Sequence, residues 1–315
     1  MRTPDAGRAP FGARLAEAMD AAGPLCLGID PHPQLLSDWD LPDTPVALER
    51  FSQTALEAAT GTGSRPLVAA IKPQVALYER HGSAGLAVLE RLLSAARRAG
   101  VLTIADAKRG DIGSTMAGYA HAWLSDSSAL AADAVTLSPY LGYGSLAPAI
   151  ELATATGRGV FVLALTSNPE GASVQHATGP DGAVARVISE AAAADNRREL
   201  ARAAGQHGGP SGRQAERRAP GASGTRPAFG PVGLVVGATV AGRAAELGID
   251  LAGVHGALLA PGFGAQGASG PGMRDGFAEA WPAVLATSSR AILRQGPSVT
   301  GLRGALAAAR DELVG

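Results

Sequence analysis

Two aspartates and one lysine, Asp106, Lys108 and Asp111, stand within six residues at the end of the apolar run 101–105. Such a run is typical of a parallel strand buried on both faces. Because Asp106 and Lys108 are two residues apart, an extended chain places them on the same face. A solvated loop is the plain alternative. The carboxyl end of a buried strand favours chemistry instead, because α/β barrels carry their catalytic groups there.

Short apolar runs alternate with Ala/Leu-rich segments of helical period along the chain. This alternation predicts a (β/α)8 TIM barrel, an α/β fold. An open, doubly wound sheet is the structural alternative, but the first strand-to-helix turn lacks a G-x-G-x-x-G sequence. The predicted strands are 24–30, 67–72, 101–105, 134–138, 159–165, 232–238, 256–260 and 283–287, and the predicted helices are 14–22, 46–60, 85–99, 114–124, 147–155, 183–194 and 240–247.

Polar side chains follow the predicted strands, and a barrel would gather them at one rim. Taken singly, each has a structural explanation, such as an aspartate that forms a turn or a serine that caps a helix. Together they predict an active site at the C-terminal ends of the strands. They are Asp30, Lys72, Asp106 with Lys108, Ser138, Ser167 with Asn168, Gln266 and Arg290.

The last two predicted strands are followed by groups that suit a phosphate. Gly262, Gly264 and Gly267 would let backbone N–H groups approach an anion closely. Gln266 can donate through its amide, and Arg290 offers a guanidinium fork. Because barrels commonly hold a phosphate at this position, we expect the substrate to be a phosphate monoester.

One segment departs from the alternating pattern. The chain has 315 residues, of which 46% are hydrophobic and 17% charged, which suits a single domain over 1–315. Residues 195–229 are rich in Arg, Gly and Pro, so we predict a flexible insertion there. Its arginines could touch nucleic acid, but a solvated linker is favoured, because the net charge of -1 implies no general affinity for polyanions.

The composition also bounds the cellular setting. Cys26 is the only cysteine, which excludes an intramolecular disulfide and fits a reducing cytoplasm. Residues 1–14 lack the apolar stretch of a signal peptide, and no run approaches the ~20 apolar residues of a membrane helix. We therefore expect a cytoplasmic protein without a membrane or nucleic-acid partner. No motif indicates a metal site or a nicotinamide, flavin or thiol cofactor.

The stretch 106–115, D-A-K-R-G-D-I-G-S-T, resembles the signature of the orotidine 5′-phosphate decarboxylase family. Within that family it is similar to the longer, type 2 bacterial subfamily found in mycobacteria and their relatives. The resemblance covers nearly the whole chain, although residues 195–229 depart from the pattern. The other matching segments are 27–33, 71–74, 138–142, 166–171 and 261–267.

This resemblance implies a carbon–carbon lyase that needs no cofactor. It would convert orotidine 5′-monophosphate (OMP) to UMP and CO2, the last step of de novo pyrimidine synthesis. The resemblance implies that Lys108 protonates C6 of the pyrimidine as CO2 leaves and that Asp106 lies against the substrate carboxylate. Lys72 would hold Asp106 and a ribose hydroxyl, and Asp30 would bind the ribose.

The resemblance also implies a homodimer. Asp111 and Thr115 would reach into the partner's site, with Asp111 completing the charge cluster there. Ser167 would hydrogen-bond the pyrimidine, and Gln266 and Arg290 would bind the phosphate.

Three other functions stay open. A Mg²⁺-dependent phosphosugar decarboxylase or aldolase of the same superfamily shares the D-x-K-x-x-D core, but Lys72 would repel a cation where an acidic ligand is expected. A Schiff-base lyase needs Lys108 as an uncharged amine, whereas the flanking carboxylates favour the ammonium form. A non-catalytic barrel that binds phosphate or nucleic acid is the third alternative.

Overall fold

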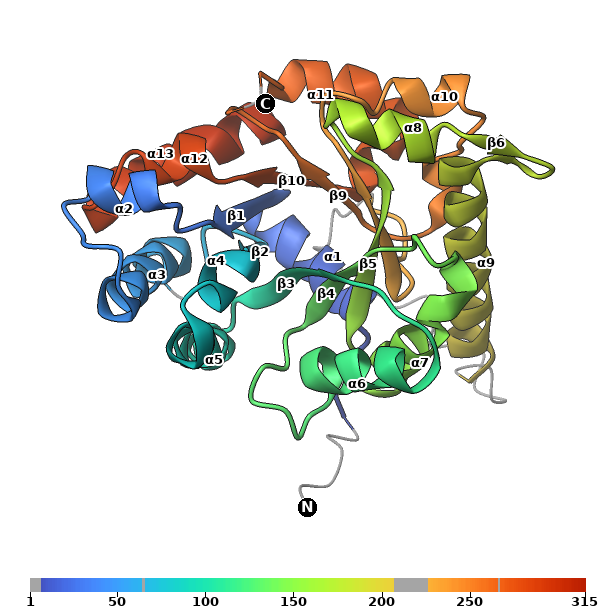
Figure 1. Cartoon of the computed structure of the whole chain (residues 1–315). Coiled ribbons are helices and arrows are strands. Elements are labelled where there is room, and N and C mark those ends of the chain that lie inside the picture. Colours follow the sequence, from blue (N-terminus) through green and yellow to red (C-terminus); the bar gives the residue numbers. More distant parts are fainter. Residues whose placement is uncertain (1–6, 64–65, 207–225, 266) are drawn as a thin grey trace.

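A computed structural model describes residues 7–63, 66–206, 226–265 and 267–315. Within these residues, eight parallel strands close into a barrel in the order β1-β10-β9-β8-β5-β4-β3-β2, with helices around it (Figure 1). The predicted (β/α)8 barrel is confirmed, and each strand overlaps its predicted range, although the third strand continues to Arg109 instead of ending at 105. The strands are β1 (Leu25–Ile29), β2 (Ala70–Pro73), β3 (Leu102–Arg109), β4 (Ala134–Leu137), β5 (Gly159–Leu165), β8 (Val232–Val236), β9 (Leu258–Pro261) and β10 (Val284–Ser288).

Helices separate the strands, and a small antiparallel hairpin of β6 (Thr178–Gly179) and β7 (Gly182–Ala183) stands outside the barrel. The helix predicted over 240–247 is reduced to a short α10 that begins after Gly242, because glycine inside a helix is unfavourable. The helices are α1 (Phe11–Ala22), α2 (Pro33–Asp38), α3 (Pro45–Thr60), α4 (Ala76–Glu79), α5 (Gly82–Arg98), α6 (Gly113–Leu124), α7 (Ala147–Ala155), α8 (Ala172–Gln175), α9 (Val184–Gln206), α10 (Arg243–Glu246), α11 (Gly270–Phe277), α12 (Arg290–Leu293) and α13 (Val299–Val314), with 3-10 turns η1 (Tyr143–Leu146), η2 (Pro169–Gly171), η3 (Ala252–Val254) and η4 (Ala278–Ala283).

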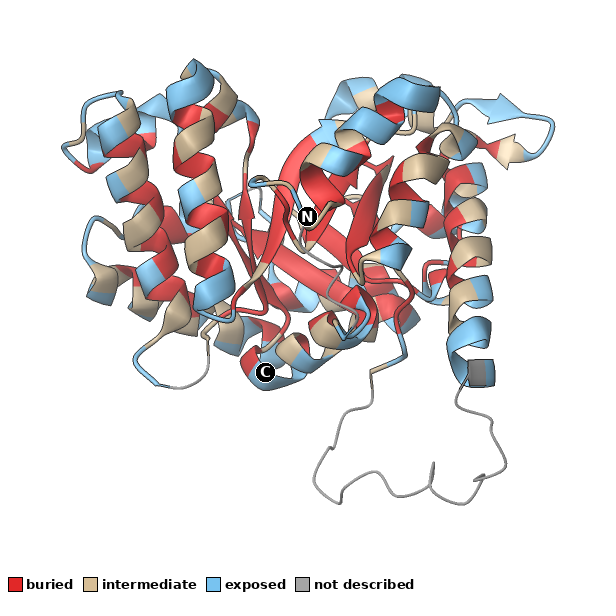
Figure 2. Cartoon of the chain, turned by 90° about the horizontal axis from the view of Figure 1, so that it is seen from below, coloured by how far each residue is buried: buried red, intermediate tan, exposed pale blue. Residues whose placement is uncertain are grey.

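Side-chain caps and apolar faces explain the longer helices. Thr44 accepts the N–H of Ala47 at 3.4 Å at the start of α3, and Ser298 accepts the N–H of Gly301 at 3.0 Å at the start of α13. The core lies within the strands and on the inward helix faces, as Figure 2 shows. Every residue of β1, β4, β8 and β10 is buried, as expected for parallel strands covered on both faces.

The first part of the segment predicted as a flexible insertion, 195–229, is helical. Residues 195–206 continue α9, which corrects the prediction of an irregular segment from 195 onward. Asn196 is fully buried, and its Nδ2 donates to the carbonyls of Val232 at 2.7 Å and Val254 at 2.9 Å. Ala and Arg are good helix formers, so the composition was compatible with a helix, and Asn196 supplies the tertiary anchor. The part of the prediction that falls on 207–225 lies outside the described residues.

Among the described residues, no helix is both long enough and apolar enough to cross a membrane.

Candidate active site

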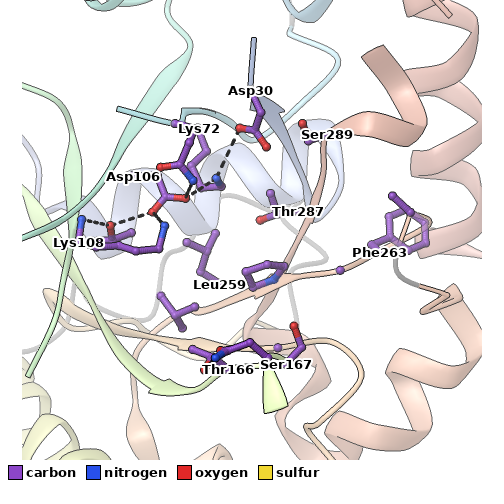
Figure 3. Close-up of a pocket in the computed structure, with 18 of the residues that line it drawn as sticks. Asp30, Lys72, Asp106, Lys108, Thr166, Ser167, Leu259, Phe263, Thr287 and Ser289 are labelled. Carbon is purple, nitrogen blue, oxygen red and sulfur yellow. Dashed lines mark hydrogen bonds and ion pairs between the residues drawn. The ribbon is translucent and has the colours of Figure 1, made fainter. Parts of the chain in front are cut away.

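A pocket of about 460 Å³ opens at the C-terminal ends of the barrel strands (Figure 3). Because parallel strands of a barrel end at one rim, side chains from all parts of the chain meet there. Seven of the rim residues predicted from the sequence line this pocket: Asp30, Lys72, Asp106, Lys108, Ser167, Asn168 and Arg290. Ser138 does not line it.

The Asp106 carboxylate is the centre of the pocket's charge cluster. Its Oδ2 accepts from Lys72 Nζ at 2.6 Å and from Gln74 Nε2 at 3.2 Å. Its Oδ1 accepts from Lys108 Nζ at 2.6 Å and from Thr136 Oγ1 at 3.0 Å. Each carboxylate oxygen therefore holds two donors, which fixes the plane of the carboxylate and keeps it ionised.

Burial and charge act in opposite directions on this cluster. Burial alone would raise the pKa of Asp106, but the charges of Lys72 and Lys108 outweigh it and hold that pKa well below its usual range. Burial alone would lower the pKa of Lys72, but the charges of Asp106 and Asp30 outweigh it and raise that pKa above its usual range. Both groups are therefore ionised at neutral pH.

Asp30 follows β1 and lies beside the cluster. Its Oδ1 is 4.0 Å from Lys72 Nζ, which is an ion pair but too long for a hydrogen bond. Among the described residues, neither the buried Asp30 Oδ1 nor the buried Ser289 Oγ has a hydrogen-bond partner. A side chain at Gly28 would approach Ser289 Cβ to 2.8 Å, so this glycine leaves the space that both groups face. Two polar atoms without a hydrogen bond at one wall suit a ligand with hydroxyl groups.

Lys108 extends into the pocket from an irregular part of β3. The pairing of β3 with β4 shifts register between Ala105 and Arg109, and Lys108 has a φ of 48°, in the left-handed region. Its side chain is 45% exposed, against 9% for that of Asp106, so its ammonium is the more accessible of the two groups. Such strain is found at functional sites, where surrounding contacts hold it. The next residue, Arg109, turns outward, with its guanidinium 5.7 Å from the ring of Tyr119 on α6.

Ser167 lines the opposite wall, after β5. The neighbouring Thr166 is held by Gln175 of α8, whose Oε1 accepts the Thr166 N–H at 2.9 Å and whose Nε2 donates to the Thr166 hydroxyl at 2.7 Å. A side chain at Gly237 would lie 3.1 Å from the Ser167 N atom, so glycine there leaves room for this segment. These contacts place a hydroxyl across the pocket from Lys72.

The phosphate end of the predicted site is reproduced only in part. Arg290, the first residue of α12, lines the pocket together with Gly262. Gly264 does not line it, and its N–H donates to the Ala268 carbonyl at 2.9 Å, so this group is engaged within the loop. The N–H of Gly267 likewise donates to the Gly264 carbonyl at 3.1 Å. Gln266, also predicted to bind the phosphate, lies outside the described residues.

Asp111 and Thr115 do not line the pocket of their own chain. Asp111 Oδ1 accepts the N–H of Ile112 at 2.8 Å, and Thr115 is exposed on α6. Large apolar side chains are exposed in the same region of the rim, after β3 and β4: Ile112 at 61%, Tyr140 at 79% and Leu141 at 54%.

Two residues that contact Asp106 were not predicted from the sequence. Gln74 follows β2 in the segment K-P-Q, and Thr136 is the only polar residue of β4. The signal for Thr136 was its place on the strand next to β3, near the end where the charged groups stand. Threonine is also common in strands for its backbone preference, so the residue type alone carries little information.

The arrangement suits a reaction that develops negative charge on a ligand carbon. Two ammonium groups are held in fixed positions, and one of them, on Lys108, is accessible enough to donate a proton. Within the described part of the chain, no cluster of three or more His, Cys, Asp or Glu side chains could hold a metal ion.

Comparison with known proteins gives one consistent answer. The model of the family described as orotidine 5′-phosphate decarboxylase / HUMPS matches residues 23–304. A Salinispora tropica protein named orotidine 5′-phosphate decarboxylase is 51% identical over 296 residues, which cover 94% of either chain. One from Streptomyces coelicolor with the same name is 48% identical over 297 residues, again 94% of either chain. A crystal structure of a Streptomyces avermitilis protein assigned to the same activity is 46% identical, with a TM-score of 0.83, and covers 100% of this chain and 98% of that one.

Proposed function

The chain belongs to the orotidine 5′-phosphate decarboxylase / HUMPS family and decarboxylates OMP to UMP, and we propose that Lys108, Asp106 and Lys72 carry out this reaction. The observation that carries the assignment of residues is the Asp106 carboxylate held between two lysine ammonium groups, each at 2.6 Å, at the C-terminal rim of the barrel. The reaction is the last step of de novo UMP synthesis.

Lys108 supplies the proton in this mechanism. The bond between C6 and the carboxylate breaks, CO2 departs, and the electron pair stays at C6. The Lys108 ammonium stabilises this developing charge and then transfers a proton from Nζ to C6, and solvent returns a proton to the neutral amine. The partly exposed side chain and the strained backbone of Lys108 support this role.

Asp106 and Lys72 prepare the electrostatic field. Asp106 holds the Lys108 ammonium in place, and its negative charge beside the substrate carboxylate favours the departure of that group as neutral CO2. Lys72 neutralises the other oxygen of Asp106 and, with Asp30, faces the side where a ribose would lie. Asp30 Oδ1 and Ser289 Oγ have no hydrogen-bond partner among the described residues, which supports a diol at this wall.

The groups that would bind the phosphate and the pyrimidine of the substrate lie on the far side of the pocket. Arg290 would hold the phosphate, with Gln266 as its partner from the sequence prediction, and Ser167 would hydrogen-bond the pyrimidine. The Gly264 N–H is occupied within its loop, so we assign Gly264 no contact with the phosphate.

The phosphosugar decarboxylase or aldolase that the sequence left open would require a divalent cation. The four donors around Asp106 disfavour that alternative, because they occupy the lone pairs that a cation would need. The identity of about half the residues to proteins named as OMP decarboxylases points the same way.

A homodimer would complete the site. Asp111 and Thr115 stand outside their own pocket and next to exposed apolar side chains, Ile112, Tyr140 and Leu141, which supports a contact with a second copy. In such a dimer, Asp111 would complete the charge cluster in the partner's site and Thr115 would contact the partner's substrate.

The direct test is an assay of purified protein with OMP, following the loss of orotate absorbance and the appearance of UMP. We expect UMP and CO2 in equal amounts, and a protein with Lys108→Ala that keeps its far-UV circular dichroism but forms almost no UMP. A wild-type preparation that leaves OMP unchanged would overturn the proposal.

A further inference from the structure

We propose that Thr136 is a positioning residue for the decarboxylation, because its hydroxyl fixes both Asp106 and Lys108. This inference rests on the proposed function of those two groups. Thr136 lies on β4, is 1% exposed and borders the pocket at the charge cluster. Its effect would pass through its two partners rather than through the substrate.

The direction of the hydrogen bonds at Thr136 follows from their chemistry. The backbone N–H of Lys108 can only donate, so Thr136 Oγ1 accepts it, at 2.9 Å. The hydroxyl has one proton, which is then available for Asp106 Oδ1 at 3.0 Å, an ionised oxygen that can only accept. One hydroxyl therefore connects the main chain of Lys108 to the side chain of Asp106.

This connection lies where β3 is irregular. The register between β3 and β4 shifts around Lys108, whose φ of 48° is unfavourable for a residue with a side chain. A regular ladder between the strands cannot hold the Lys108 N–H at such a shift, and the Thr136 hydroxyl supplies the acceptor instead. Without that acceptor, the backbone can relax toward an ordinary strand and carry the Lys108 ammonium away from C6.

The same hydroxyl restrains Asp106. Lys108 Nζ and Thr136 Oγ1 both donate to Asp106 Oδ1, but Lys108 reaches it with a long, flexible side chain, whereas the hydroxyl of Thr136 stands on a short, β-branched side chain with few rotamers. Loss of the hydroxyl would let this carboxylate oxygen move with the lysine. The Asp106 carboxylate and the Lys108 ammonium would then no longer be held in position by a shared hydrogen-bond partner.

Thr136→Val is the informative variant, because it keeps the shape of the side chain and removes only the hydroxyl. We expect kcat to fall by about 10²-fold, the cost of misplacing a reacting group by about 1 Å. KM for OMP and the dissociation constant of UMP, measured by calorimetry, should stay close to the wild-type values, because β4 with Thr136 stands across the barrel from β10, which precedes the predicted phosphate ligand Arg290. Thr136→Ser keeps the hydroxyl and should restore most of kcat.

Thr103→Val is a matched control. Thr103 is also a buried threonine on a strand, and its hydroxyl also makes two hydrogen bonds. Thr103 Oγ1 donates to Asp133 Oδ2 and accepts the Asp133 N–H, each at 3.0 Å. It lies at the other end of β3 and does not line the pocket. This variant should lower the melting temperature and leave kcat unchanged.

An unchanged kcat in folded Thr136→Val would overturn the inference, as would an equal loss of kcat in Thr103→Val. The inference would also fail if a rise in KM accounted for the whole loss of kcat/KM in Thr136→Val. If Thr136→Val does not fold, Thr136→Ala carries the same expectation. Failure of the proposed function itself is distinguishable, because wild-type protein would then form no UMP.

Discussion

The ammonium of Lys72 and the carboxylate of Asp106 lie 2.6 Å apart at the floor of the pocket, with their side chains only 5% and 9% exposed. A buried pair of this kind contributes little net stability when both partners are present, but removing one partner leaves an uncompensated charge. The pair therefore links the chemistry of the site to the stability of the barrel.

Asp106→Asn should destabilise the protein by about 3–5 kcal/mol at pH 7, because Lys72 loses its nearest counter-charge. Urea denaturation followed by circular dichroism measures this change. Asp38→Asn, which changes an exposed carboxylate on α2, is the control and should stay within about 0.5 kcal/mol of wild type. An equal effect of the two substitutions would contradict the expectation.

The pH dependence of stability should reflect the same pair. The folded pKa of Asp106 lies below its unfolded value of about 3.9, so its contribution is complete above that value and is lost as pH falls through the folded pKa. The folded pKa of Lys72 lies above its unfolded value of about 10.4, so its contribution is complete below that value and is lost as pH rises through the folded pKa. Unfolding free energies of Asp106→Asn should lack the acid-limb loss that Asp106 gives the wild type.

Lys108→Ala should lower kcat for OMP by at least about 10³-fold, because it removes both the proton donor and the fixed positive charge. Binding of UMP, measured by calorimetry, should persist, since the phosphate and ribose contacts remain. Lys108→Ala with kcat within tenfold of wild type would remove Lys108 from the mechanism.

Metal removal should leave the activity unchanged. Hydrogen-bond donors occupy the Asp106 oxygens, and the positive charges of Lys72 and Lys108 beside this carboxylate would repel a metal ion. Initial rates after dialysis against EDTA, with and without added Mg²⁺, check this expectation. A rate that disappears on dialysis and returns with Mg²⁺ would favour the cation-dependent phosphosugar chemistry instead.

Arg290→Ala should reduce kcat/KM for OMP by about 10²-fold, because a guanidinium pair with a phosphate is a charge-assisted contact of roughly 1.5–3 kcal/mol. Arg294→Ala is the matched control, since Arg294 is an exposed arginine one turn further along that does not line the pocket. Measuring kcat/KM of both variants with orotidine as substrate, which lacks the phosphate, separates a phosphate contact from a general charge effect. On that substrate, Arg290→Ala should behave as wild type.

A mixture of Asp111→Ala and Lys108→Ala proteins should regain activity. In a shared-site homodimer, a hybrid of the two has one intact site, so full exchange restores about a quarter of wild-type activity. Subunit exchange is verified independently, by mass spectrometry of differently tagged chains. Proven exchange without recovery would refute the contribution of Asp111 to the partner's site.

Most of the fold was accessible from the sequence, for a physical reason. A parallel strand covered on both faces must be largely apolar, so β1 and β8 appear as continuous apolar runs and β4 and β10 as mostly apolar ones. The extension of α9 to Gln206 was missed, because its anchor is the buried hydrogen bonding of Asn196 to carbonyls of distant segments.

The sequence by itself determined which chemical groups stand at the barrel rim, because each follows its own strand and barrel closure brings the strand ends together. The charges of Asp106, Lys108 and Lys72 were predictable in this way. Only the tertiary structure decided how they are held. The Thr136 hydroxyl reaches Asp106 and Lys108 across the shifted register of β3 and β4, and the loop around Gly264 directs its N–H to Ala268 rather than to the pocket. Such contacts depend on the pairing of segments distant in the chain, which no local pattern of residues encodes.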